Sequence, residues 1–175
     1  MDLYENIFEL IDMRSFSNLW YWIGLAVLWS SASHWVLGVP VDLIHRARRL
    51  EGETMQDLQD LVRINCNRIH YIIEMSGLWL LGFVSFILTT LAILGGFYNV
   101  EFAQAVFLLF APMAVVGSLS LALARDVTKK QPTGQMLCKR LLRHRIYIQL
   151  IGVVSIFVTA MWGMYQNMNF SALFG

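Results

Sequence analysis

His34 and Glu74 are the two ionisable residues whose positions could support chemistry inside a membrane. Both lie in or beside long apolar segments, where an ionisable group is costly and usually faces a partner or a cavity. At a rise of about 1.5 Å per helical residue, their side chains could sit at similar depth. We therefore expect a His34–Glu74 hydrogen bond, with Ser30, Ser31 and Ser33 able to assist.

Three roles are open for these two residues. They could form a buried polar clamp that fixes the register of two helices, or they could form a proton relay or a ligand site. Alternatively they do not pair, and Glu74 reaches the membrane interface beside Arg68 or Arg125.

Residues that bind cofactors form no recognisable pattern in this sequence. A b-type haem needs two axial ligands, usually histidines from two helices, and no spacing motif supports a site at His70 and His144. Cys66 and Cys138 cannot supply the four thiolates of an ordinary iron–sulfur cluster. We find no phosphate-binding glycine loop, no paired catalytic carboxylates and no zinc-ligand spacing. We therefore expect no catalytic residue, no metal, no cofactor and no enzymatic activity.

The elements that must position His34 and Glu74 are four long segments without Asp, Glu, Lys or Arg. The chain is 57% hydrophobic and 14% charged, which is far more apolar than a soluble domain. A helix needs about 20 apolar residues to cross a hydrocarbon core of about 30 Å. The sequence predicts an all-α integral membrane bundle of four transmembrane helices. The charge-free segments are 19–41, 75–97, 102–124 and 146–165.

The positive charges predict the orientation of these spans. Five of the 13 Lys and Arg residues lie between the first and second segments and seven lie between the third and fourth, so that only Arg14 remains. Cytoplasmic loops retain Lys and Arg, so we place both of these loops in the cytoplasm. With an even number of spans, both termini then face away from the cytoplasm.

The connecting segments complete a single membrane domain over 1–175. We expect helical cytoplasmic extensions of spans one and two, because Thr54 to Asp57 resembles a helix start and apolar residues then recur at helical spacing. A turn is expected at Glu51-Gly52-Glu53. The expected segments outside the spans are an outer amphipathic helix over 1–18, a cytoplasmic helical loop over 42–74, an outer turn over 98–101, a basic cytoplasmic loop over 125–145 and an outer tail over 166–175.

The N-terminal segment has an apolar face and an acidic face when drawn as a helix. Its start is acidic rather than basic, so we expect no cleaved leader. The segment could lie along the outer membrane surface, or it could dock onto a basic patch of a partner. The apolar face carries Leu3, Ile7, Leu10 and Ile11, and the acidic face carries Asp2, Glu5, Glu9 and Asp12.

Small residues at helical spacing predict where helices approach each other. Lipid is as apolar as a leucine side chain, so helices in a membrane associate where small residues allow close contact. These stripes face either the bundle interior or another subunit. They comprise Ser30 in span one, Gly82, Ser85 and Thr89 in span two, and Gly152, Ser155, Thr159 and Gly163 in span four.

A dense run of basic residues lies beside the third and fourth spans. We expect these residues to anchor the chain to anionic lipid headgroups, with an acidic cytoplasmic partner as the alternative. So short a patch beside the membrane is not expected to bind nucleic acid. The residues are Lys129, Lys130, Lys139, Arg140, Arg143 and Arg145.

Four stretches of the chain carry a resemblance to a known family. They are 8–22 (FELIDMRSFSNLWYW), 33–40 (SHWVLGVP), 61–65 (LVRIN) and 157–167 (FVTAMWGMYQN). The chain resembles a family of small alphaproteobacterial four-helix membrane proteins, some of which are labelled as a component of the SufBCD complex, an iron–sulfur assembly complex. The resemblance implies a bacterial cytoplasmic (inner) membrane, and it brings no catalytic residues.

These features favour a non-catalytic accessory or scaffolding subunit of a larger inner-membrane protein complex. Its partners would be the lipid bilayer and either other membrane-protein subunits or a second copy of itself. One alternative is a small transporter or proton-conducting protein that uses His34 and Glu74. Another is a redox or quinone-linked membrane protein.

Overall fold

The computed structural model describes the backbone of residues 15–174 and the side chains up to residue 168. The amphipathic helix expected over 1–18 therefore lies almost wholly outside the described residues. The described chain is helical apart from one short hairpin. Its elements are η1 (Ser15–Ser17), α2 (Leu19–His34), β1 (Trp35–Val36), β2 (Val39–Pro40), α3 (Val41–Leu50), α4 (Gly52–Gly96), α5 (Glu101–Lys130) and α6 (Gly134–Phe174).

Three of these helices are long and apolar enough to cross a membrane. They are α4, α5 and α6, which contain 45, 30 and 41 residues. They contain the apolar segments 102–124 and 146–165 in full and 75–97 except for its last residue. The protein is therefore a helical membrane protein, as the composition predicts.

The first expected span differs from the prediction. Helix α2 contains 16 residues, which at about 1.5 Å each gives a length of about 24 Å and falls short of a full span. A tight hairpin follows, in which Trp35 pairs with Pro40 and both turn residues, Leu37 and Gly38, have positive φ angles of 52° and 73°. A single continuous helix over 19–41 is therefore not formed, and α3 is a separate helix rather than an extension of the first span.

The helical extension of the second span is confirmed. Helix α4 runs without interruption from Gly52 to Gly96 and so contains 75–97 except for its last residue. The expected turn also separates α3 from α4, with Glu51 and Gly52 at φ angles of 52° and 58°. The left-handed conformation at these two positions ends α3 and reverses the chain.

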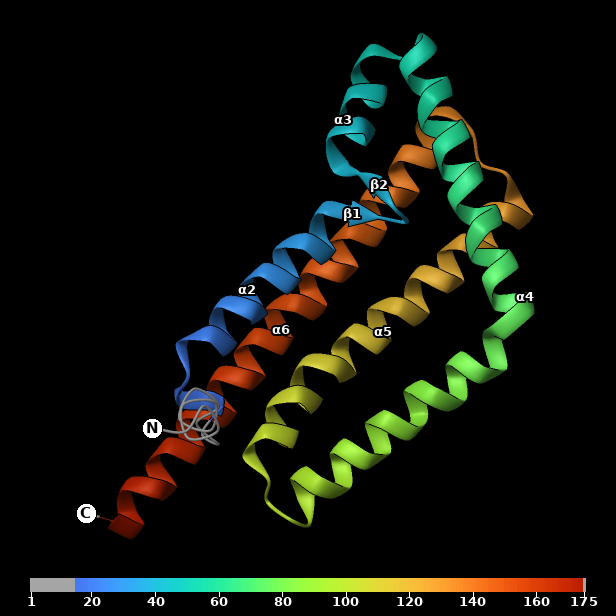
Figure 1. Ribbon diagram of the computed structural model, residues 1–175. Coiled ribbons are helices and arrows are strands. Elements are labelled where there is room, and N and C mark those ends of the chain that lie inside the picture. The colour runs from blue at the N-terminus through green and yellow to red at the C-terminus, as the bar shows by residue number, and fades with distance from the viewer. Residues whose placement is uncertain (1–14, 175) are drawn as a thin grey trace, which may run out of the picture.

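The helices form two antiparallel pairs that lie closest together at one end (Figure 1). Helix α2 lies along α6, and α4 lies along α5. The hairpin, α3, the start of α4, the end of α5 and the start of α6 gather at the end that we call the head. Both ends of the described chain and the α4–α5 connection lie at the opposite end, which we call the far end (Figure 1).

The head contains the main apolar core of the described chain. Its side chains come from both strands and from four helices, so it joins the two helix pairs. The side chains at its centre are 0–2% exposed, as in a soluble protein core. Its buried members include Val36, Val39, Ile44, Ala47, Leu58, Val62, Cys66, Ala124, Leu137, Cys138 and Leu141.

The α2–α6 pair depends on close approach at Gly152. An added Cβ atom at Gly152 would lie 2.8 Å from the Trp29 ring, whereas an added Cβ at Gly82 of α4 would meet nothing within 4 Å. We predict that Gly152→Ala lowers the free energy of unfolding by about 1–3 kcal/mol, because the indole ring must shift. Gly82→Ala is the matched control and should not lower it. The measurement is unfolding in mixed micelles by titration with a denaturing detergent, and equal effects of the two substitutions would contradict the packing described.

Candidate functional site

The buried amide of Gln104 joins three helices at the far end. Its Nε2 donates to the carbonyl of Gly95 at 2.8 Å, and its Oε1 accepts from Trp162 Nε1 at 3.0 Å and from Gln166 Nε2 at 2.6 Å. Gly95 lies in the last turn of α4, where backbone carbonyls lack a partner within the helix. We call these four residues the Gln104 node. The node provides hydrogen-bond partners for polar groups that lipid tails could not satisfy.

The beginning of the described chain is fixed to the same end by further hydrogen bonds. The Glu101 carboxylate accepts from the backbone N–H of Phe16 at 2.9 Å, and the Phe16 carbonyl accepts from Trp22 Nε1 at 3.0 Å. The Tyr21 hydroxyl donates to the carbonyl of Ala105 at 3.1 Å. Glu101 and Tyr21 therefore hold η1 and α2 against α5.

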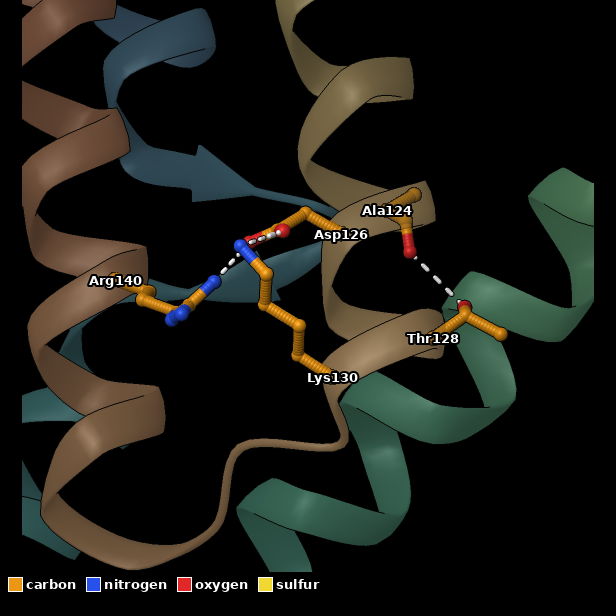
Figure 2. Close-up of polar contacts among 5 residues, drawn as sticks. All are labelled: Ala124, Asp126, Thr128, Lys130 and Arg140. Atoms are coloured by element: carbon orange, nitrogen blue, oxygen red, sulfur yellow. Dashed lines mark hydrogen bonds and ion pairs between the residues drawn. The ribbon is translucent and has the colours of Figure 1, made fainter.

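At the head, Asp126 closes the α5–α6 hairpin. Its carboxylate accepts from Lys130 on the same helix at 2.6 Å and from Arg140 on α6 (Figure 2). On the other side of this turn of α5, Thr128 donates to the carbonyl of Ala124 at 2.9 Å. We call Asp126, Lys130 and Arg140 the Asp126 clamp. Its function is structural, because all three charges are used within the hairpin.

Some of the basic residues near the third and fourth predicted spans form contacts within the chain, and others do not. Lys130 and Arg140 are paired with Asp126, and Arg145 Nε donates to the backbone carbonyl of Ser33 at 3.3 Å. Lys129, Lys139 and Arg143 are exposed, and within residues 15–174 none of them forms an ion pair. Only part of the predicted headgroup site is thus free to meet a ligand.

The expected hydrogen bond between His34 and Glu74 is not formed in the described chain. Both side chains are exposed or nearly so, and the ion-pair partner of Glu74 is His70, one helical turn away at 3.8 Å. The reason is the pairing of the helices, since α2 packs on α6 while α4 packs on α5. His34 instead stacks edge-on against Trp35 at the start of the hairpin.

A buried histidine does contact a hydroxyl group, but at another position. His144 on α6 is 5% exposed, and its Nε2 lies 3.1 Å from the Ser120 hydroxyl on α5. His70 is engaged with Glu74, so the two histidines considered for haem have different partners. The His144–Ser120 contact joins α6 to α5.

The two long stripes of small residues have different surroundings. Gly152, Ser155, Thr159 and Gly163 of α6 are all buried, and Gly163 faces Phe16 and Trp22. By contrast, the side chains of the α4 stripe are exposed, as is Ser30 of α2. The exposed members of the α4 stripe are Gly82, Ser85 and Thr89.

Both cysteines are buried in the head core. Cys66 is 2% exposed and Cys138 is 0% exposed. Burial raises the pKa of each thiol above its ordinary value, so the reactive thiolate is scarce at neutral pH. Among residues 15–174, no group of three His, Cys, Asp or Glu side chains is placed to hold a metal ion.

An apolar hollow of about 390 Å³ lies between α5 and α6 at mid-span. Pro112 and Ser155 line it among apolar side chains, and the Ser155 hydroxyl has no hydrogen-bond partner among the described residues. A second hollow of about 340 Å³ lies at the head between α4 and the α5–α6 turn, beside Arg63 and Cys66. Neither brings together the groups that acid–base or nucleophilic catalysis would need.

Sequence reasoning missed the two residues that organise the site. Gln104 is the only amide in the segment 102–124, and Asp126 is the only acidic residue in 125–145. Each is thus a polar or oppositely charged exception within its segment. That pattern is a usable signal, because such an exception needs a specific partner to offset its cost.

Comparisons with known proteins add no relative. The chain matches no protein-family model, no curated protein and no solved structure.

Removing the Gln104 amide should weaken the far end of the bundle. We predict that Gln104→Leu lowers the free energy of unfolding by about 1–2 kcal/mol, because the Gly95 carbonyl and the Trp162 indole lose their partner. Gln149→Leu is the matched control, since Gln149 is exposed on α6 and should tolerate the change. Both are measured by detergent-induced unfolding in mixed micelles. A Gln104→Leu variant as stable as the control would show that the node is dispensable.

Proposed function

We propose that this protein is a non-catalytic accessory or scaffolding subunit of a larger inner-membrane complex, and that α4 carries its contact with a partner. The observation that supports this is the exposed small-residue stripe on α4. None of the most apolar eighteen-residue stretch of α4 is buried within the chain. The partner would be a membrane-spanning helix of another subunit.

Only part of α4 is covered by α5. Val84, Ile87 and Leu88 are half-buried on the side toward α5, while on the other side Leu78 and Trp79 are 86% and 83% exposed. Large apolar side chains alone would suit contact with lipid. A glycine, a serine and a threonine at helical spacing suit contact with another helix, because they allow the two backbones to approach closely.

Gly82 carries this argument most directly. No atom of the described residues lies within 4 Å of a Cβ built at Gly82, so packing among these residues does not require a glycine there. A glycine inside a helix costs about 1 kcal/mol relative to alanine. An external helix that packs against this position would offset that cost, just as the chain's own Trp29 occupies the space beside Gly152.

The proposed topology has four crossings with both termini on the non-cytoplasmic side. Helix α2 would be the first crossing, since 19–34 contains no Asp, Glu, Lys or Arg, and the hairpin would lie at its cytoplasmic end as part of the head. The head would be cytoplasmic, because it carries twelve of the thirteen Lys and Arg residues.

The topology is testable with single cysteines in a background that lacks Cys66 and Cys138. Asn99→Cys at the far end should react with a membrane-impermeant maleimide in intact cells. Thr133→Cys at the α5–α6 turn should react only after the membrane is opened. Equal labelling of both positions in intact cells would contradict the proposed orientation.

The accessory role predicts a stable complex in mild detergent. The tagged chain, extracted from its own membrane, should co-purify with one or more other membrane proteins at a fixed ratio. Gly82→Leu should abolish this, because the larger side chain blocks close helix approach. Gly117→Leu is the matched control, since Gly117 of α5 is also exposed with nothing within 4 Å. A native mass that corresponds to the single chain or to its homo-oligomer would refute the accessory role.

A further inference from the structure

Four basic side chains of the α5–α6 hairpin are exposed and take part in no ion pair within the described residues. They are Arg125 and Lys129 on α5, and Lys139 and Arg143 on α6. We call them the cation patch. We propose that the cation patch binds the phosphates of anionic phospholipids where this hairpin leaves the membrane. This inference does not depend on the identity of any protein partner.

The depth of the patch matches the lipid headgroups. Arg125 directly follows the segment 102–124 and Arg143 lies three residues before 146–165, which places them about 1.5–4.5 Å from the edge of the hydrocarbon. Lys129 and Lys139 lie about 7–10 Å from that edge by the same measure. The headgroup layer is about 5–7 Å thick on each side. Long lysine side chains can turn back toward it and bring all four charges to the phosphate level.

Contacts between the two helices bring these charges to one level. The Asp126–Arg140 ion pair joins α5 to α6 in the middle of the basic segment. The Ser120–His144 contact at 3.1 Å joins them about one turn closer to the membrane centre. The four cations therefore gather within about two helical turns of each other along the hairpin.

Within 125–145 there is no unpaired acidic residue to oppose an anionic lipid. Asp126 is the only acidic residue in 125–145, and its carboxylate is occupied by Lys130 and Arg140. The clamp as a whole keeps one positive charge. These ion pairs thus neutralise the Asp126 carboxylate, which would otherwise repel a lipid phosphate.

Next to the two cations of α6, the surface of this helix carries an exposed tyrosine and exposed aliphatic side chains, which a bound lipid would contact. Tyr147 lies four residues after Arg143, which lies four after Lys139, so the three side chains share one face of the helix. Tyr147 is 49% exposed and the neighbouring Ile146 is 53% exposed. The aromatic ring suits the headgroup level, and the exposed aliphatic residues beyond it suit contact with the acyl chain of the same lipid.

The test compares two spin-labelled lipids around the full chain reconstituted in phosphatidylcholine bilayers. Electron paramagnetic resonance measures the share of each lipid that the protein immobilises. We expect spin-labelled phosphatidylglycerol to be preferred several-fold over spin-labelled phosphatidylcholine. Arg143→Gln should reduce that preference by up to about fivefold, which is the contribution of one cation at an anionic surface, and Lys139→Gln combined with it should reduce it further.

The control is Arg63→Gln, which removes an arginine that is paired with Asp60 at 2.9 Å and lies about 18 Å beyond the start of the second apolar segment. This variant should keep the preference of the native chain. A second arm uses the native chain in about 1 M salt, where screening should abolish the preference whatever the variants do. Equal binding of the two lipids, a preference that survives high salt, or an equal loss in Arg63→Gln would overturn the proposal.

Discussion

Inside a bilayer, moving an apolar side chain from lipid to a helix interface yields little free energy, so helices stay together only through close packing and hydrogen bonds. The α2–α6 pair uses close packing, with Gly152 against Trp29. At the far end, α4, α5 and α6 use hydrogen bonds, which converge on Gln104. The head core joins both helix pairs through apolar side chains that are buried as in a soluble protein.

The positions of these contacts explain why so much of α4 is uncovered. The head core and the Gln104 node hold α4 near its two ends, and between them α4 is covered only on the side toward α5. The Asp126 clamp has two effects. It closes the α5–α6 hairpin, and it neutralises the only acidic residue of the basic segment 125–145. The four cations that remain are then free for lipid, and the α4 stripe is free for a partner helix.

Patterns along single helices could be predicted from the sequence, and relations between helices could not. Charge-free runs revealed the helices that contain 75–97, 102–124 and 146–165, and the spacing after Thr54 revealed the head end of α4. The hairpin was missed because Gly38 and Pro40 lie inside an apolar run that resembles a span. The His34–Glu74 bond was inferred from depth alone, but hydrogen bonding also requires adjacent helices, and α2 and α4 belong to different pairs. Both long stripes had the same spacing, yet only the α6 stripe is buried.

The central claim is that the α4 stripe faces a partner protein rather than lipid. The most direct test places a photoreactive amino acid at Ser85 in the full chain and irradiates native membranes. Val153 of α6, which is 66% exposed and belongs to no small-residue stripe, serves as the reference position. The account predicts a discrete protein adduct from position 85 and lipid adducts from position 153. Lipid adducts alone from both positions would contradict it.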